Sequence, residues 1–591
     1  MTPTDDPRDD DRFGLHVRDL ASLRREARVL DHGVLASVVR VDIDACGTSP
    51  SLLSNPAWPR LVRLSIEPRG DGVSLEAHFD APAPVGDVVA AVARSVVPGR
   101  LEPAGWPATA TGPASRTWAP DADFPPDLVV TDEPLSLQDV PDPHPVLTRP
   151  PVVVVTGPDP TWTDSEDRGT DSGPIDLGPL DERLLNPVGF KRQHRQPVAH
   201  LVAHEDPDRL ELRTAKGKVL LDTRHGPSEQ DIDGLRRLAA VHLSWEGTRG
   251  PRAYARVVAG LAMAGVPLVG DPVPDWANAL LHPALTEVLT RVPTGSVDGG
   301  VSTTLDLDDI VEREAHSIRL RRAALTHHSA AGWRRAAGLA HGLQTMPAPK
   351  VSVLLPTRRP EQVAFALRQV ARQRGVDLEL VLVTHGFEAG DADLEAFKAT
   401  GVHLTVLEAG VDRPFGAILN LAARAASGDV FLKMDDDDWY GRDFASDLLL
   451  ARAYSGADVV GTPPEFTYVE PLGTTVRRQD ATEAFRPIVA GGTMLVDRGT
   501  FTAVGGFRET RKFVDAGLLA AVREAGGTVY RSHGHGYVLR RGAQGHTWDP
   551  GLGYFVSRKL SWHQWRGFRP SPLLEPDEVD LPPHPIGEAP A

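Results

Sequence analysis

Short apolar runs alternate with helix-like segments between residues 350 and 570. The runs VSVLLP (351–356), LELVLV (378–383) and 404–407 have the length of buried strands. Between them, residues 363–373 and 415–426 carry apolar side chains at helical spacing. Strands that alternate with amphipathic helices are typical of a mostly parallel sheet flanked by helices, so we predict an α/β fold for this part of the chain.

The next apolar run, residues 430–432, leads into a stretch of consecutive carboxylates within VFLKMDDDDWY. The four aspartates are Asp435, Asp436, Asp437 and Asp438. Adjacent carboxylates repel one another at a strand end unless a cation lies among them, and oxygen ligands suit Mg²⁺ or Mn²⁺. We therefore predict a divalent metal site; the alternative is a solvated acidic loop, which would not need an apolar strand leading into it.

Polar residues also follow the first two predicted strands. Thr357 ends the first, and Thr384 and His385 end the second. Ligands of such sheets bind beyond the carboxyl ends of the strands. We expect these three side chains and the aspartates to converge on one crevice.

The rest of the chain predicts further domains. We expect a disordered tail at residues 1–12, a small α/β domain at 13–99, a Pro-rich linker at 100–150, an α/β accessory domain at 151–345 and a loose tail at 571–591. Within the accessory domain, a helix over 254–264 turning through Gly265 into a strand resembles the nucleotide-sugar half of two-Rossmann (GT-B) glycosyltransferases. We interpret this Rossmann-like domain as degenerate or structural, because no acidic pair for a nucleotide accompanies it.

A probable helix near residue 310 carries four arginines: Arg313, Arg319, Arg321 and Arg322. A solvated helix face is the default interpretation. A site for an anionic acceptor or a lipid phosphate is the functional alternative.

Bulk properties exclude several classes of protein. The 591 residues are 41% hydrophobic and 24% charged, and 63 basic against 80 acidic residues give a net charge of −17. This charge argues against general nucleic-acid binding. The single cysteine, Cys46, excludes an intramolecular disulfide framework. The polar N-terminus and the lack of long apolar runs predict a cytoplasmic protein without a transmembrane segment, with peripheral association at the inner face of the membrane left open.

Four motifs in the C-terminal part occur in a characteristic order: VSVLLPTRRP, VLVTHG, GAILNLAARAASGDVFLKMDDDDW and AGGTMLVDRGTFTAVGGF. In order and spacing they resemble inverting glycosyltransferases of family 2, which have the GT-A fold. The resemblance covers about 220 residues, roughly 350–570. It implies transfer of a sugar from a nucleotide-sugar donor, in the presence of Mn²⁺ or Mg²⁺, to a glycan or lipid-linked acceptor.

The resemblance also implies roles for individual residues. Those expected to contact the nucleotide-sugar are Pro356, Thr357, Arg358, Thr384, His385, Asn420, Asp435 and Asp436. Those expected to hold the metal are Asp435, Asp437, Asp438 and the late His546. The family usually has an acidic pair where this chain has Thr384-His385, so the donor nucleotide cannot be deduced.

A transferase also needs a base for the acceptor hydroxyl. We choose Asp515, because the family places an acidic pair after its Gly-Gly-Phe turn; Val514 stands at the other position. A helix cap is the alternative role for Asp515, and Glu509 is the reserve candidate for the base. Arg540 and Arg541 are placed either at the diphosphate or in solvent.

Two rival functions remain beside a transferase that assembles cell-surface polysaccharide. The chain could be a binding or scaffold protein whose transferase domain is inactive, given the lost acidic pair at 384–385. It could also be a Mg²⁺-dependent nucleotidyltransferase, although PTRRP lacks the glycines of a phosphate loop. The aspartates and the candidate base favour the glycosyltransferase.

Overall fold

The structure is a computed structural model that describes residues 11–19, 33–45, 61–69, 72–86, 198–206, 209–214, 217–222, 229–290, 305–329, 349–478, 480–525, 527–542, 551–557 and 561–582, with shorter stretches between 22 and 30, 88 and 182, and 331 and 332. The chain divides into two units. The N-terminal unit spans 1–187, 193–308 and 316–346, and the C-terminal unit spans 188–192, 309–315 and 347–591. The separate domains expected at 13–99 and 151–345 both fall in the first unit, apart from residues 188–192 and 309–315, and their separation stays a prediction.

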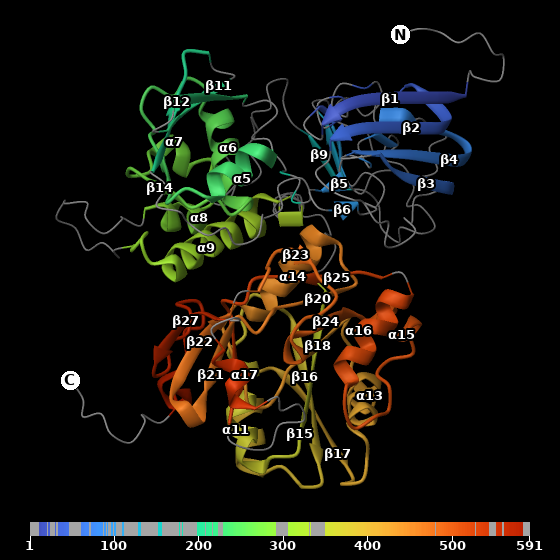
Figure 1. Ribbon diagram of the computed structural model, residues 1–591, viewed down its shortest axis with the longest axis vertical. Coiled ribbons are helices and arrows are strands. Elements are labelled where there is room, and N and C mark those ends of the chain that lie inside the picture. Colours follow the sequence, from blue (N-terminus) through green and yellow to red (C-terminus); the bar gives the residue numbers. More distant parts are fainter. Residues whose placement is uncertain are drawn as a thin grey trace. The chain divides into compact units, whose positions relative to one another are not determined.

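The first sheet of the N-terminal unit has the order β1-β2-β4-β3 (Figure 1). Its strands are β1 (Arg12–Asp19), β2 (Leu35–Ala45), β3 (Leu61–Arg69) and β4 (Gly72–Pro84). β1 and β2 are parallel, and the other pairs are antiparallel. Alternate residues of β2 and β4, such as Val39, Val41 and Leu75, form the apolar core on one face, as expected for a strand period of two.

A second sheet has the order β12-β11-β10-β13-β14. Its strands are β10 (Ala199–Ala203), β11 (Arg209–Thr214), β12 (Gly217–Asp222), β13 (Val241–Leu243) and β14 (Leu268–Gly270). The predicted helix-turn-strand is confirmed: α6 (Pro251–Met263) ends at a turn in which Gly265 has φ +78°, and β14 follows. A left-handed residue at a helix end favours glycine. Other helices of the accessory part are α5 (Glu229–Arg236), α7 (Asp275–Asn278) and α8 (Pro283–Leu289).

Two sequence expectations for the N-terminal half differ from the structure. The Pro-rich segment expected to lack regular elements contains β7 (Thr109–Thr111) and β8 (Leu128–Thr131), and β8 pairs in parallel with both β7 and β9 (Val152–Val155). The short pair β5 (Val96–Val97) and β6 (Arg100–Leu101) lies at the start of this segment.

Helix α9 (Ile310–His328) does not present a solvated arginine face, because Arg313 and Arg321 are buried. Arg313 Nη1 lies 2.7 Å from Glu314 Oε1, which compensates its charge.

The main sheet of the C-terminal unit has the order β17-β16-β15-β18-β24-β20-β25-β23. Its first half is parallel, as predicted: β15 (Val351–Thr357), β16 (Leu378–His385), β17 (His403–Ala409) and β18 (Val430–Lys433). The other half is mixed, because β24 (Leu495–Asp497) runs antiparallel to both β18 and β20 (Val459–Gly461). β25 (Val529–Arg531) and β23 (Ala484–Phe485) complete the sheet.

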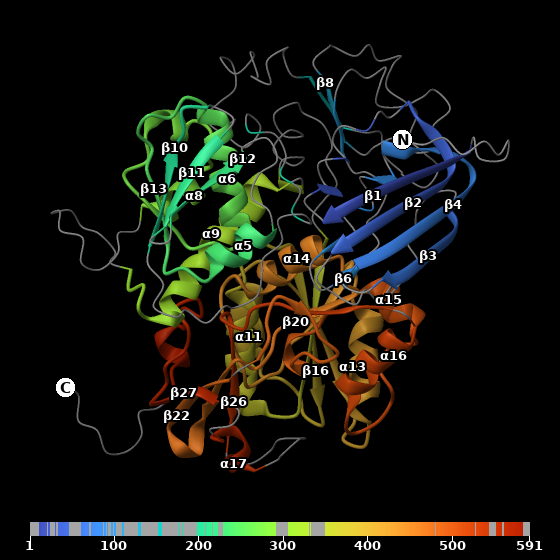
Figure 2. The same ribbon diagram turned by 45° about the horizontal axis from the view of Figure 1, so that its top comes forward.

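Helices cover both faces of this sheet. α13 (Phe415–Ala425), α15 (Arg498–Ala503) and α16 (Val514–Glu524) lie on one side, and α11 (Val363–Ala371) lies on the other, as Figures 1 and 2 agree. Ile418, Leu419 and Leu518 pack with Leu354 and Val381 of the sheet in one apolar core. This packing fixes α13 and α16 against the sheet in which the aspartates follow strand β18. The remaining helices of this unit include α12 (Asp391–Lys398), α14 (Phe444–Ser455) and α17 (Leu552–Phe555).

A second sheet in the C-terminal unit was not predicted. Its order is β19-β26-β21-β22-β27, with β19 (Trp439–Tyr440), β21 (Phe466–Val469), β22 (Thr474–Arg478), β26 (Tyr537–Arg541) and β27 (Ser561–Arg566). β19 begins directly after the last aspartate and pairs antiparallel with β26. The acidic run therefore bridges the ends of two sheets, which hold it from both sides.

The C-terminal segment was expected to be loose, but residues 571–582 pack against α11 and β19. Asp580 accepts hydrogen bonds from Arg368 Nε at 2.8 Å and from Gln369 Nε2 at 2.8 Å. Its main-chain oxygen accepts from Trp439 Nε1 at 2.8 Å. The expectation failed because the segment carries its own buried residues, including Leu573 and Leu574.

Substitution Asp580→Ala is expected to lower the stability of the full chain by about 1–3 kcal/mol, because Gln369 and Arg368 lose a buried acceptor. Thermal unfolding of the variant measures this loss. The matched control is Asp577→Ala, since Asp577 pairs with Arg442 at 2.9 Å in an exposed position, where an ion pair contributes about 0–1 kcal/mol. Equal effects of the two substitutions would contradict a locking role for Asp580.

Candidate active site

The first cluster of the site joins the end of β15 to the middle of the acidic run. Thr357 Oγ1 donates to Asp436 Oδ2 at 2.5 Å. Arg359 Nε donates to the same oxygen at 3.1 Å, and its Nη2 donates to Asp436 Oδ1. Arg359 Nη1 donates to Asp437 Oδ2 at 2.8 Å. One guanidinium group therefore holds two adjacent carboxylates.

The second cluster joins the first aspartate to the predicted base. The Lys433 ammonium group is buried and lies 2.6 Å from Asp435 Oδ1 and 3.6 Å from Asp515 Oδ1. It also donates to Gly491 O at 3.1 Å. The side chains of Asp435 and Asp515 are 35% and 33% exposed to solvent. A single cation from β18 therefore lies between the acidic run and the start of α16.

Two glycines allow this close approach. A Cβ atom on Gly491 would lie 2.1 Å from Asp515 Oδ2, and one on Gly492 would lie 2.8 Å from Asp435 Oδ2. Any larger residue would displace one of the two carboxylates. The Gly-Gly pair of the AGGTM motif thus makes room for both acidic side chains at one edge of the sheet.

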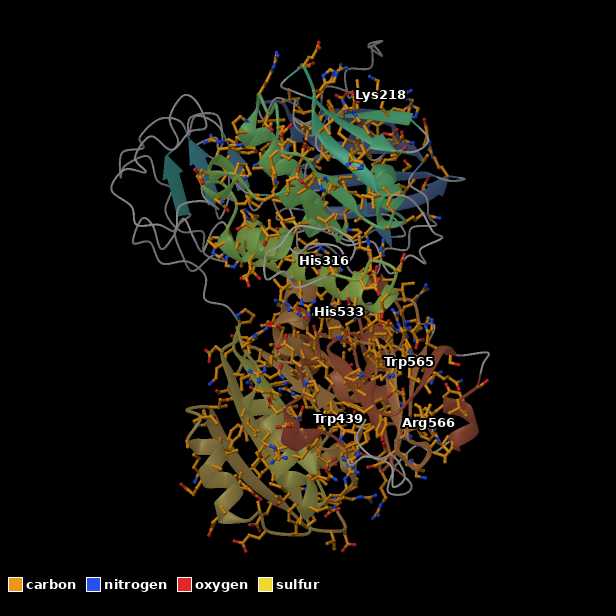
Figure 3. All side chains as sticks on the ribbon, turned by 90° about the vertical axis from the view of Figure 1, so that its left-hand side faces the viewer. Lys218, His316, Trp439, His533, Trp565 and Arg566 are labelled. Atoms are coloured by element: carbon orange, nitrogen blue, oxygen red, sulfur yellow. The ribbon has the colours of Figure 1, made fainter. Side chains whose placement is uncertain are left out.

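Asp438 lies deeper than the other aspartates. Its Oδ2 accepts from Tyr537 Oη at 2.6 Å, and its Oδ1 accepts from the Arg540 main-chain N–H at 2.8 Å. Tyr440 Oη accepts from the Asp435 N–H at 2.8 Å and donates to Gly492 O at 2.9 Å. Trp439, between them, lies in the interior of the C-terminal unit (Figure 3). These contacts fix the backbone of the acidic run.

Burial and mutual charge shift the protonation of these groups. Burial raises the pKa of Asp515, the Lys433 charge partly offsets this, and the Asp435 charge adds to it. Burial also raises the pKa of Asp437 despite Arg359, and it raises the pKa of Asp438 together with the charges of Asp437 and Asp435. Burial opposes the charged form of Lys433, but Asp435 and Asp515 raise its pKa overall. The cluster thus favours cations and penalises further negative charge.

Several residues predicted to contact the nucleotide-sugar have other partners. Thr384 is buried, with Oγ1 3.5 Å from Leu407 O, and His385 Nε2 donates to Val411 O at 3.0 Å. The Asn420 side-chain amide makes two hydrogen bonds to the main chain of Phe507: Nδ2 donates to Phe507 O and Oδ1 accepts from Phe507 N, both at 2.9 Å. This pair of bonds positions the turn that leads to Asp515.

The remaining residues predicted for the site differ in their exposure and in their partners. Pro356 is buried at the end of β15, and Arg358 and Glu509 are exposed. The Arg540 guanidinium pairs with Glu470 at 2.7 Å, and Arg541 is buried with its guanidinium 4.7 Å from the centre of the Phe555 ring. His546 lies outside the described residues. Arg540 and Arg541 were expected either at the diphosphate or in solvent. In the structure, both guanidinium groups contact other side chains of the C-terminal unit.

Sequence reasoning missed Lys433 and Arg359. The signal for Lys433 was a charged residue inside an apolar strand, two positions before a carboxylate: such a residue must be paired when it is buried. Arg359 follows the predicted first strand by two residues, at the end where ligands and carboxylates were expected. Both supply positive charge that the sequence analysis had assigned to a metal ion alone.

The donor set suits a divalent cation only in part. Within the described ranges, no group of three or more His, Cys, Asp or Glu side chains converges as a ready metal site. Asp438 already uses both oxygens, whereas Asp435 Oδ2 and Asp437 Oδ1 have no hydrogen-bond partner in the part of the chain that is described. Two carboxylate oxygens suit Mg²⁺ or Mn²⁺, because these ions commonly complete their coordination with phosphate oxygens and water.

No protein-family model and no curated protein matches the chain. Solved structures that match include the mannosyltransferase PcManGT from Pyrobaculum calidifontis in complex with GDP-Man and Mn²⁺, with 18% identity and a TM-score of 0.27 over 34% of this chain and 59% of that one. They also include S. aureus TarS 1-349 in complex with UDP-GlcNAc, with 17% identity and a TM-score of 0.27 over 33% of this chain and 60% of that one. This chain thus spans less than two thirds of the length of either protein.

No helix in the described part of the chain combines the length and the apolar character that a membrane crossing requires.

Proposed function

We propose that the C-terminal unit is a glycosyltransferase that moves a sugar from a nucleotide-sugar donor to an acceptor hydroxyl with inversion, and that the acceptor is a glycan or a lipid-linked saccharide. The observation that carries this proposal is the contact of Lys433 with both Asp435 and Asp515. It supports one reaction centre in which a group for the leaving diphosphate and a group for the attacking hydroxyl lie next to each other.

Asp515 is proposed as the base. Its Oδ1 has no hydrogen-bond partner among the described residues, although Lys433 lies 3.6 Å away. Burial raises its pKa above that of an ordinary carboxyl group, which makes it a stronger proton acceptor near neutral pH. The sequence alternative, a helix cap, is disfavoured because the N-cap position of α16 is held by Phe513, two residues before Asp515.

The proposed transfer is one displacement at the anomeric carbon. The acceptor oxygen forms a bond to this carbon while the bond from the carbon to the diphosphate oxygen breaks. The proton of the hydroxyl passes to Asp515, and the electron pair of the broken bond leaves with the nucleoside diphosphate. Attack opposite the leaving group inverts the configuration.

Asp435 and Asp437 are proposed to hold Mn²⁺ or Mg²⁺ through their unpartnered oxygens. When bound, such a cation neutralises charge on the departing diphosphate. The chain's own residues supply the remaining positioning: Tyr440 fixes the backbone of Asp435, and Tyr537 with the Arg540 N–H fixes Asp438.

The proposal is tested by donor-dependent hydrolysis. The full chain is incubated with a panel of nucleotide-sugars and Mn²⁺, and release of nucleoside diphosphate is measured for the wild type and for Asp437→Asn. We expect release from at least one donor and a loss of about 10²–10³-fold in the variant, the usual effect of removing one stabiliser of developing negative charge.

The rival functions predict other outcomes. An inactive scaffold would neither bind nor cleave any donor of the panel. A nucleotidyltransferase would release pyrophosphate from a nucleoside triphosphate and leave nucleotide-sugars intact. Either result would overturn the transferase.

A further inference from the structure

Arg359 occupies the carboxylates that the proposed reaction needs. Its three nitrogen atoms Nε, Nη1 and Nη2 all donate to Asp436 or Asp437. Asp436 is fully engaged, because Thr357 also donates to it. The Arg359 side chain is only 25% exposed and that of Asp436 8%, so these bonds are formed largely out of water. Planar forked donors of this kind form the strongest carboxylate pairs available to a side chain.

A second cation at Asp437 would meet this guanidinium at close range. Asp437 Oδ2 accepts from Arg359 at 2.8 Å, and the two oxygens of one carboxylate are only about 2.2 Å apart by covalent geometry. Two positive charges at such separations repel strongly where water is partly excluded. Binding of a divalent ion to Asp437 is therefore strongly disfavoured while the Arg359 guanidinium keeps its contact with this carboxylate.

The position of Arg359 suggests what releases it. It follows the carboxyl end of β15, the edge at which ligands of parallel sheets bind. A guanidinium group pairs with phosphate as well as with carboxylate, and both are recognised by the same fork of N–H donors. When a diphosphate binds with a divalent ion at Asp435 and Asp437, Arg359 loses its contact with Asp437, and the diphosphate supplies another anion with which it can pair.

We propose that Arg359 is a resident cation that competes with the divalent ion for Asp437 in the free protein and pairs with the diphosphate of the donor once the ion is bound. This inference rests on the proposed function and adds an order to it: the ion enters with the diphosphate and not before it. The same substitution at Arg359 must then strengthen one binding event and weaken another.

Binding of Mn²⁺ alone tests the first half. The free-ion signal in electron paramagnetic resonance is titrated with full-length wild type, Arg359→Gln, Arg424→Gln and the double variant Arg359→Gln/Asp437→Asn. Arg424 is exposed near the end of α13, so its substitution removes the same charge elsewhere. We expect Arg359→Gln to bind Mn²⁺ about 10–100-fold more tightly than wild type, since even at the dielectric constant of water the repulsion between a single and a double positive charge about 4 Å apart corresponds to about 30-fold in affinity.

Binding of magnesium pyrophosphate tests the second half. Isothermal titration at saturating Mg²⁺ is expected to show affinity in the wild type and about tenfold weaker affinity in Arg359→Gln, which has lost one charge-assisted contact. Arg424→Gln is expected to follow the wild type in both titrations, and the double variant is expected to lose the gain in Mn²⁺ affinity. Arg359→Lys keeps the charge without the fork and is expected to lie between wild type and Arg359→Gln.

The opposite signs of the two shifts identify the competition. Equal Mn²⁺ affinity in wild type and Arg359→Gln, a gain that survives Asp437→Asn, or no binding of magnesium pyrophosphate to the wild type would each overturn the inference. If Arg359→Gln does not fold, Arg359→Lys carries the same comparison. Neither titration uses a sugar donor, so a failed competition with intact donor hydrolysis, or the reverse, separates this inference from the proposed function.

Discussion

Asp515→Asn is expected to reduce sugar transfer by about 10²–10⁴-fold, the usual contribution of a positioned general base. The asparagine has nearly the same shape, so it fits beside Gly491, where any Cβ on the glycine would collide with the Asp515 carboxylate. It cannot accept the acceptor proton. Donor binding is expected to persist, because Asp435 and Asp437 are unchanged. Single-turnover transfer and nucleotide binding, measured on the same preparation, separate these two effects.

Glu509→Gln is the matched control for the base. Glu509 lies on the same loop before α16 and was the reserve candidate, but it is exposed, and no contact links it to Lys433 in the described part of the chain. Its substitution is expected to leave the rate of transfer within about twofold of wild type, as for surface changes in general. A large loss in Glu509→Gln with none in Asp515→Asn would reassign the base.

Lys433→Met is expected to change both the stability and the pH dependence of the protein. It removes the buried cation between Asp435 and Asp515 while keeping most of the side-chain volume. Breaking a fully buried pair costs about 3–5 kcal/mol, and we expect about 2–3 kcal/mol here, because both carboxylates keep a third of their exposure. Thermal unfolding at pH 7 measures this loss.

The pH profile gives a readout that a purely structural role would not move. The Lys433 charge lowers the pKa of Asp515, against the burial that raises it. A base acts in its deprotonated form, so transfer falls as the pH drops through its pKa. Removal of Lys433 raises that pKa further, and the acid limb of kcat/KM is expected to move to higher pH in Lys433→Met. Lys433→Arg keeps a positive charge and is expected to keep the limb near its wild-type position; an unmoved limb in Lys433→Met would contradict the coupling.

The parallel half of the C-terminal sheet could be predicted because its signals are local. β15, β16 and β18 are mostly apolar runs, and α11 and α13 have apolar residues at helical spacing. The antiparallel strand β24 could not be predicted, because it has only three residues and its direction is set by where the chain returns. The second sheet escaped prediction for the same reason: β19 pairs with β26, about a hundred residues away.

The charge of the candidate site could be predicted from residue type, but the hydrogen-bond partners could not. A cation was expected among the aspartates, and the structure places two side-chain cations of the chain there, Lys433 and Arg359. The expected contact of Asn420 with the nucleotide stays a prediction, whereas the bonds of its amide to Phe507 were not foreseen. Hydrogen-bond partners of this kind lie far apart in the chain, and a single sequence contains no record of them.

The paired hydrogen bonds between Asn420 and Phe507 have a mechanical consequence. Helix α13 leads directly into the strand that carries the aspartates, and the Phe507 turn leads to the helix that carries Asp515. The Asn420 amide therefore links the segment that leads to the aspartates with the segment that leads to Asp515. Separation of these two segments would require both hydrogen bonds to break, so we expect the distance between the proposed base and the proposed ligands of the cation to vary little.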